Sequence, residues 1–201
     1  MVFVKICGLR SEEHVDAAIE GGADAVGFVL TDSPRYIDVD SARSLVEHVA
    51  QRALTFAVVR DVSVEEAHRL ANETGAEVVQ VHGEFTPQQI EWLVAQGRPV
   101  VRAVPFSRAD EGSLGEQYLL IDAPRAGSGE PWDYASMRDA ALPKQWLLAG
   151  GLTPDTVADA IRASGAWGVD VSSGVEVAPG EKSSTLIRAF LDAAKSARVA
   201  R

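Results

Sequence analysis

The sequence predicts an α/β fold: a single-domain (β/α)8 TIM barrel, in which eight parallel strands close into a ring and are each followed by a helical segment. Short apolar runs rich in β-branched residues alternate with helical patterns along nearly the whole chain, and this alternation is typical of a parallel sheet. It occurs eight times, which favours closure over an open sheet. The length of 201 residues fits one small barrel, so residues 1–201 are expected to form one domain.

The predicted strands cover residues 3–7, 25–30, 54–59, 77–82, 99–104, 118–122, 146–149 and 168–171. The predicted helices begin near Ser11, Asp40, Ser63, Thr86, Trp132, Thr153 and Ser184. Ser63 with Glu66, and Thr86 with Gln89, have capping-box spacing, and Thr153 before a proline predicts an N-cap. Residues 107–116, after the fifth strand, have no apolar stripe, so the helix there is expected to be reduced to a loop or single turn.

Charge and composition exclude several classes of function. The formal charge is 19 − 29 = −10, and non-specific nucleic-acid binding needs lysine and arginine, so no nucleic acid is expected as a partner. No apolar run approaches the roughly 18 residues of a membrane helix, so no membrane partner is expected and the protein is interpreted as cytoplasmic. Cys7 is the only cysteine and the four histidines are scattered, so no disulfide and no metal site is predicted.

Cys7 ends the first predicted strand, in Lys5-Ile6-Cys7-Gly8. Strand side chains alternate, so Lys5 and Cys7 share a face. If that face lines the barrel interior, the lysine charge should favour the thiolate, the form that abstracts a proton. Cys7 is therefore a candidate general base, and the alternative is a small buried hydrophobic residue.

Two aspartates also end strands. Asp122 follows four apolar residues of the sixth strand, where desolvation should raise its pKa and suit it to act as a general acid; the alternative is a loop anchor. Asp170 ends the eighth strand, which neighbours the first in a closed barrel, so Asp170 could pair with Lys5. A supporting role in orienting the substrate is expected for Asp170.

The strongest signal is for a phosphate. Gly150 and Gly151 follow the seventh strand, and Ser172, Ser173 and Gly174 follow the eighth. Phosphate sites in such barrels are typically built from these two loops, where glycine lets an anion approach the backbone. Because the chain is acidic, the phosphate would be held by backbone N–H groups and a helix end. The alternative is that these glycines serve only as turns.

Two further polar residues are candidates for substrate binding. Arg35 follows the second strand and could pair with a carboxylate through two parallel hydrogen bonds. His82, on one face of the fourth strand with Gln80, reaches the barrel mouth. A solvated surface arginine and a structural histidine are the alternatives.

Taken in order and spacing, these segments resemble the phosphoribosylanthranilate isomerase family. The resemblance spans the whole chain and rests on residues 5–8, 21–29, 33–37, 79–83, 120–122, 127–129, 132–134, 149–152 and 169–176. It implies an isomerase of tryptophan biosynthesis that converts N-(5-phosphoribosyl)anthranilate to 1-(2-carboxyphenylamino)-1-deoxyribulose 5-phosphate. The substrate's own imine nitrogen serves as the electron sink, so no cofactor is expected.

The resemblance also implies roles for individual residues. Asp122 would protonate the ring oxygen, and Cys7 would remove the C2′ proton. Arg35 would bind the anthranilate carboxylate, and His82 and Asp170 would lie at the sugar. Gly150, Gly151, Ser172, Ser173 and Gly174 would hold the phosphate.

Two alternatives remain open from the sequence. One is the related histidine-pathway aminoaldose–ketose isomerase, against which Cys7 and the absence of internal duplication argue. The other is a non-catalytic phosphate-binding barrel, against which the presence of both Cys7 and Asp122 argues. Monomer and homodimer are both compatible with the sequence.

Overall fold

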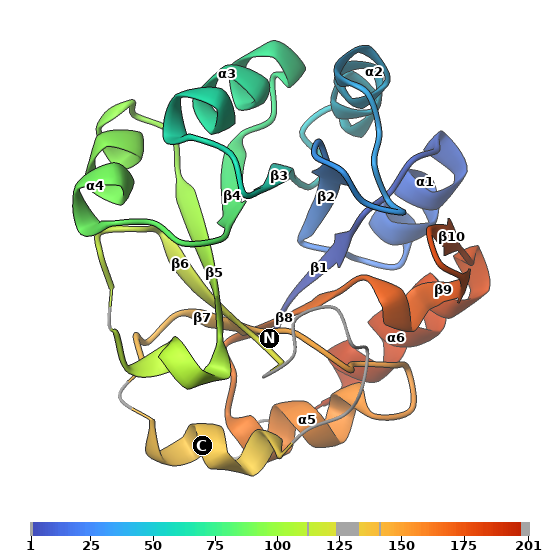
Figure 1. The fold of residues 1–201 in the computed structure, drawn as a ribbon. Helices are drawn as coiled ribbons and strands as arrows, with labels where there is room; N and C mark the ends of the chain where they lie inside the picture. Colours follow the sequence, from blue (N-terminus) through green and yellow to red (C-terminus); the bar gives the residue numbers. More distant parts are fainter. Residues whose placement is uncertain (1, 112, 124–132, 141, 198–201) are drawn as a thin grey trace.

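In a computed structural model, which describes residues 2–111, 113–123, 133–140 and 142–197, eight parallel strands form a closed barrel in the order β1 to β8 (Figure 1). The strands are β1 Phe3–Cys7, β2 Ala25–Val29, β3 Leu54–Arg60, β4 Val78–His82, β5 Val100–Pro105, β6 Tyr118–Asp122, β7 Trp146–Leu148 and β8 Gly168–Val171. The ring closes by pairing of β1 with β8, which sets Lys5 opposite Asp170. The predicted fold class is confirmed, and strand boundaries differ from expectation by one residue at most.

Helical segments surround the barrel (Figure 1). They are α1 Glu12–Glu20, α2 Val39–Val49, α3 Val64–Thr74, α4 Pro87–Ala95, η1 Phe106–Glu111, η2 Tyr134–Asp139, α5 Val157–Ser164, η3 Ser173–Val175 and α6 Ser184–Ser196, where η marks a 3-10 helix. A short antiparallel hairpin, β9 Glu176–Ala178 and β10 Glu181–Lys182, stands between β8 and α6. The short η1 after β5 agrees with the reduced helix that the sequence predicts.

The helix starts agree only partly with the sequence. Thr86 and Gln89 form the full capping box of α4. Ser63 caps α3 through the N–H of Glu66, but the Glu66 carboxylate pairs with Arg69 instead of completing a box.

The N-cap expected at Thr153 is wrong. The hydroxyl of Thr156 accepts from the N–H of Thr153, a turn follows, and α5 begins at Val157. Trp132, where another helix was expected to begin, lies outside the described residues; the next helical segment there is η2.

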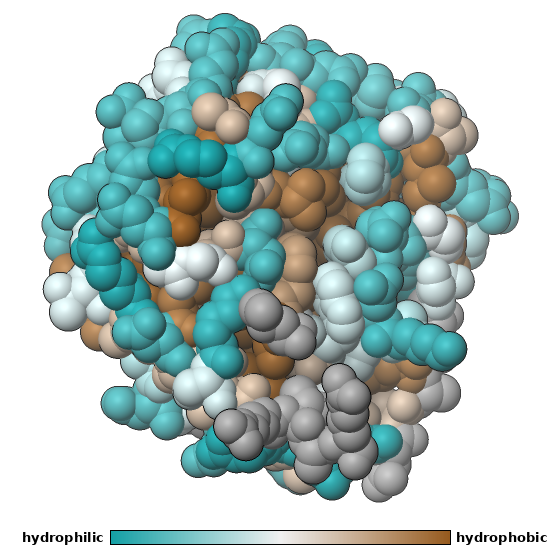
Figure 2. All heavy atoms as spheres, turned by 180° about the vertical axis from the view of Figure 1, so that it is seen from behind, coloured by the Kyte–Doolittle hydropathy of each residue, from teal (hydrophilic) through white to brown (hydrophobic). Residues whose placement is uncertain are grey.

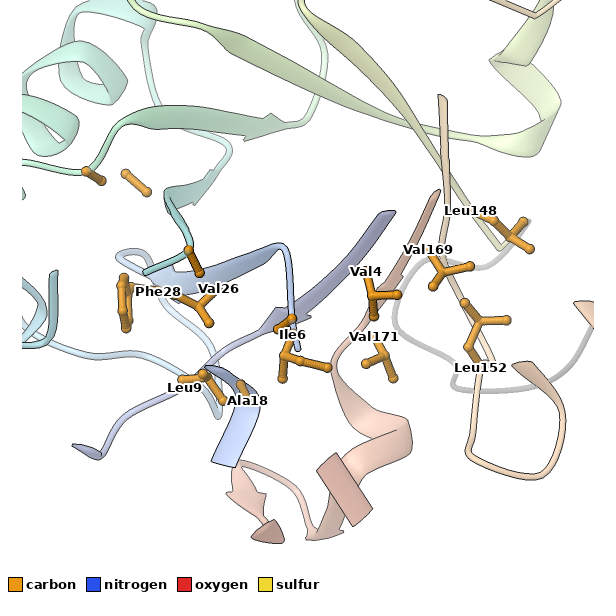
Figure 3. Close-up of a cluster of buried hydrophobic side chains, with 14 of the residues drawn as sticks. Val4, Ile6, Leu9, Ala18, Val26, Phe28, Leu148, Leu152, Val169 and Val171 are labelled. Atoms are coloured by element: carbon orange, nitrogen blue, oxygen red, sulfur yellow. The ribbon is translucent and has the colours of Figure 1, made fainter. Parts of the chain in front are cut away.

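Two apolar layers stabilise the barrel. Alternate strand residues such as Val4, Ile6 and Val169 point outward and pack against helices (Figure 3). A second, smaller cluster, which includes Phe56, Val78 and Leu120, fills the barrel interior. Because these side chains occupy the interior below the mouth, it is a packed core rather than a channel. Burying one such side chain contributes about 1.5–3 kcal/mol.

The end of the barrel where the strands begin is closed by aromatic rings. The ring of Trp167 stacks on those of Phe3 and Tyr118, with centroids 4.9 Å apart in each case. The opposite end, where the strands finish, is therefore the end open to ligands.

Arg102, on β5, faces outward, because its neighbours Val101 and Ala103 face the barrel interior. There it forms a buried ion pair with Glu116, at 3.1 Å.

On one side of the molecule, Figure 2 shows hydrophilic residues around the margin and hydrophobic residues in the recessed centre. Within the described ranges, no helix has the length and apolar character needed to cross a bilayer. The same residues contain no group of three or more histidine, cysteine, aspartate or glutamate side chains suited to a metal.

Candidate active site

A cavity of about 330 Å³ opens at the carboxyl ends of the strands. All ten residues singled out from the sequence line it: Cys7, Arg35, His82, Asp122, Gly150, Gly151, Asp170, Ser172, Ser173 and Gly174. They come from β1, β4, β6, β8 and the loops after β2, β7 and β8. The fold therefore brings together, at one mouth, residues separated by up to 167 positions in the chain.

Cys7 faces the interior, as the alternation predicts. Its side chain belongs to the inner apolar cluster and is 6% exposed. Gly27, its register partner on β2, leaves the necessary room: a Cβ there would lie 3.2 Å from the Cys7 sulfur and 3.1 Å from Lys5 Nζ.

The Lys5 charge favours the thiolate of Cys7, as expected, but burial of the thiol outweighs it. Burial raises the pKa of the Cys7 thiol, and the Asp170 carboxylate acts in the same sense. The ammonium groups of Lys5 and Lys182 lower the pKa without cancelling the effect of burial. The resting group is therefore a thiol, with two cations placed to stabilise the thiolate once it forms.

Lys5 and Asp170 form the ion pair that the sequence suggested. The ammonium lies 2.9 Å from Asp170 Oδ1, and the Lys5 side chain is fully buried. Burial lowers the pKa of Lys5, but the carboxylate and the nearby sulfur raise it above its ordinary value, so Lys5 remains charged. Its ammonium also lies 5.2 Å from the centroid of the Phe56 ring, a favourable cation–π distance.

Asp122 ends β6, which is not a neighbour of β1, the strand that carries Cys7. The Asp122 side chain is partly buried. Burial raises the pKa of its carboxyl and outweighs the hydrogen bond from the Ala123 N–H to Oδ1, at 2.8 Å, which lowers it. A carboxyl with a raised pKa keeps a proton to higher pH, which is the property required of a general acid.

The two glycine-containing loops pack against each other. Gly150 and Gly151 have φ angles of 84° and 68°, a region that favours glycine. A Cβ on Gly174 would lie 1.8 Å from the Leu152 carbonyl oxygen, so glycine at 174 is what lets the loop after β8 contact the loop after β7. The hydroxyl of Tyr134 adds a hydrogen bond to the Gly150 carbonyl, at 3.0 Å. The glycines therefore have a packing role, and this is compatible with their also exposing N–H groups to an anion.

Arg35 is held by a carboxylate of the protein. Its Nε and Nη2 donate to the two oxygens of Glu176, at 2.7 and 2.9 Å. Lys182 donates to the same carboxylate at 2.7 Å and to the Ser172 carbonyl at 2.8 Å. Burial alone would raise the pKa of Glu176, but the two cations lower it below its ordinary value, so Glu176 is ionised. The β9–β10 hairpin thus connects Arg35 to the loop after β8.

His82 is neutral. Burial, with the charges of Arg60 and Lys5, lowers the pKa of His82 to about 3. Its Nε2 lies 2.8 Å from Gln80 Nε2, so the Gln80 amide donates and the ring proton is on Nδ1. Gln80 Oε1 is buried and has no hydrogen-bond partner among the described residues. Gln80 is among the residues that line the cavity.

Four residues of the site were missed as candidates in the sequence: Arg60, Gln80, Glu176 and Lys182. Strand period would have identified Arg60, because it shares the inward face of β3 with Val58. No local signal identifies Glu176 and Lys182. Their place in the site depends on contact between the β9–β10 hairpin and Arg35, which lies 141 positions before Glu176.

The closed barrel and the polar cavity at the carboxyl ends of its strands define a (β/α)8-barrel enzyme. The family model for N-(5′-phosphoribosyl)anthranilate isomerase matches residues 4–193. The isomerase of this name from Rhodospirillum rubrum is 41% identical, with 96% of this chain and 97% of that protein covered. The chain belongs to the N-(5′-phosphoribosyl)anthranilate isomerase family.

Solved structures agree with this membership. The crystal structure of TrpF from Jonesia denitrificans is similar with a TM-score of 0.88 and 41% identity, covering 98% of each chain. A phosphoribosyl anthranilate isomerase in complex with reduced 1-(o-carboxyphenylamino)-1-deoxyribulose 5-phosphate has a TM-score of 0.85 and 32% identity, with 97% of this chain and 99% of that chain covered.

Proposed function

We propose that this chain converts N-(5-phosphoribosyl)anthranilate to 1-(2-carboxyphenylamino)-1-deoxyribulose 5-phosphate in the biosynthesis of tryptophan, in the cytoplasm, with residues 1–201 acting as one catalytic domain. The observation that carries the proposal is the single cavity in which Cys7, Asp122 and the two glycine-containing loops meet. Family membership supports the substrate, and the meeting of these residues in one cavity supports the roles proposed below.

Asp122 is the proposed general acid. It donates its proton to the ring oxygen of the furanose while the bond from C1′ to that oxygen breaks and the nitrogen lone pair forms the C1′=N double bond. Burial of Asp122 supports this role because it keeps the carboxyl protonated to higher pH.

Cys7 is the proposed general base. As a thiolate it removes the C2′ proton, and the C2′–H electron pair forms a C1′=C2′ bond while the C1′=N electrons return to nitrogen. The resulting enolamine tautomerises to the ketose. Lys5 and Lys182 support this step, because their charges stabilise the thiolate against burial.

The remaining residues hold the substrate. Gly150, Gly151, Ser172, Ser173 and Gly174 are the proposed phosphate cradle, and His82 and Asp170 are the proposed contacts of the sugar. Arg35 is the proposed contact of the anthranilate carboxylate. Glu176 uses Nε and Nη2 of Arg35, which leaves Nη1 available for a ligand.

The productive form of the free enzyme carries a proton on Asp122 and none on Cys7. Burial raises the pKa of both groups, which favours the proton on Asp122 and opposes the thiolate of Cys7. Below the pKa of Asp122 both groups are protonated, and above the pKa of Cys7 neither is. A plot of kcat/KM against pH should therefore be bell-shaped.

The decisive test is consumption of fluorescent phosphoribosylanthranilate by the purified protein. Loss of fluorescence that depends on enzyme concentration is the expected result. Failure to consume it would contradict the proposal, and turnover of the histidine-pathway aminoaldose in its place would establish the alternative isomerase.

A further inference from the structure

The mouth of the barrel has one wall opposite the proposed phosphate cradle. In a closed ring of eight strands β3 lies across from β7, and Gly150 and Gly151 follow β7. A ligand held by its phosphate at the loops after β7 and β8 therefore extends its other end toward β2, β3 and β4.

Arg60 stands on that opposite wall. It is the last residue of β3 and pairs in register with His82 on β4. Its backbone N–H donates to Thr31 Oγ1 at 3.0 Å, which fixes its position at the rim. The side chain is exposed and lines the cavity. Its charge lowers the pKa of His82 and opposes the raised pKa of Asp122, so the guanidinium lies within electrostatic reach of both.

Among the described residues, Arg60 differs from Arg35 in having no counterion. The guanidinium group of Arg35 pairs with the carboxylate of Glu176, and that of Arg108 pairs with the carboxylate of Glu84. Within the described part of the chain, no carboxylate lies within ion-pair distance of the Arg60 side chain, although Asp32 lines the same cavity. A cation at the mouth without a protein partner can pair with a ligand anion without first breaking an existing ion pair.

We propose that Arg60 is a specificity-determining residue that binds the carboxylate at the aryl end of the substrate, beside Arg35. This inference rests on the proposed function, because that function supplies a ligand with a phosphate at one end and an aromatic carboxylate at the other. Two guanidinium groups would then share one carboxylate, which has two oxygens able to accept from both.

Equilibrium binding separates this role from any effect of Arg60 on proton transfer. Two ligands are needed: the reduced product analogue, with its 2-carboxyphenylamino group, and the otherwise identical compound made from aniline, which lacks the carboxylate. Calorimetric Kd values would be measured for wild type, Arg60→Gln and a control, Arg188→Gln. Arg188 is an exposed arginine of α6 that pairs with Glu20, so the control makes the same change of net charge away from the mouth.

Arg60→Gln should weaken the carboxylated analogue about fivefold or more, as loss of a partly exposed ion pair implies. It should leave the aniline-derived analogue within about twofold. Arg188→Gln should leave both unchanged, and the Arg60 effect should shrink as salt rises.

Equal losses for both analogues, or no loss for either, would overturn the proposal. Failure of the proposed function gives a different result: wild type would not consume phosphoribosylanthranilate, while the selective effect of Arg60→Gln on the carboxylated analogue would persist.

Discussion

The two ends of the cavity differ in the residues that line them. Among the described residues, the lining of the loops after β7 and β8 is mostly glycine, alanine and serine and includes no lysine or arginine: Ala149, Gly150, Gly151, Leu152, Ser172, Ser173 and Gly174. Around β2 and β3 the lining includes two arginines, Arg35 and Arg60. One end therefore offers backbone N–H groups, and the other offers guanidinium groups.

This difference shows how an acidic chain can bind an anion at both ends of one ligand. Backbone donors carry no net charge and need no counterion, but they require the close loop packing that Gly150 and Gly174 allow. Guanidinium groups can reach further, but a buried one must be partnered, as Arg35 is by Glu176. Between the two ends lie Cys7 and Asp122, the proposed base and acid.

The largest effect should come from the residues between the ends. Cys7→Ser and Asp122→Asn should each lower kcat by about 10²–10⁴-fold, because general acid–base catalysis contributes that much per group. Inorganic phosphate should still inhibit or bind with a Kd close to that of wild type, since the phosphate end is unchanged. A variant that keeps the wild-type kcat would remove its residue from the proposed role.

The arginine end can be broken through its counterion. Glu176→Gln removes the carboxylate between Arg35 and Lys182, whose side chains are 22% and 1% exposed. Leaving a buried cation unpartnered should cost about 3 kcal/mol in the free energy of unfolding, with a raised KM from the loosened Arg35.

A matched double variant sharpens this test. Adding Lys182→Met to Glu176→Gln removes the unpartnered cation and should recover part of the lost stability in urea unfolding. Additive losses would show that the two side chains do not stabilise each other.

The phosphate end can be broken by adding one methyl group. Gly174→Ala places a Cβ against the Leu152 carbonyl, so the two loops must separate, at about 2 kcal/mol, and the affinity for inorganic phosphate should fall. Gly97→Ala is the control. Its φ is +80° but its Cβ would meet nothing within 4 Å, so it should cost about 1 kcal/mol and leave phosphate affinity unchanged. Equal phosphate affinity in both variants would contradict the proposed cradle.

The smallest effect concerns pH and the neutral histidine beside Arg60. Because the pKa of His82 is lowered to about 3 in the folded state, the unfolded chain binds the proton first as pH falls below about 6.5. Stability should therefore decrease from pH 6.5 toward pH 3, with His82 contributing about 1–2 kcal/mol of loss at pH 5. His82→Gln should flatten that part of the urea-unfolding profile relative to wild type. An unchanged profile would mean that His82 is readily protonated in the folded protein.

Much of the fold and site could be predicted from local patterns. Eight apolar runs located the strands, and period two placed Lys5 and Cys7 on one shared face, which the structure shows to be the inward face. The position of each candidate at the end of a strand placed all ten in one cavity. Local patterns were weaker at helix starts: the Thr153 hydroxyl, expected to cap a helix, bonds the Thr156 hydroxyl instead, and a turn precedes α5.

The sequence by itself determined which strand residues share a face and which candidates end a strand, because side-chain alternation and the limits of the apolar runs are properties of the local chain. Only the tertiary structure decided their ionisation and partners. Whether Cys7 rests as a thiol depends on how burial compares with the charges of Lys5 and Lys182. Whether a guanidinium is occupied, as in Arg35, or open, as in Arg60, depends on which carboxylates fold within a few ångströms of it. These are distances between residues far apart in the chain, and Coulomb energies and desolvation depend on such distances rather than on sequence spacing.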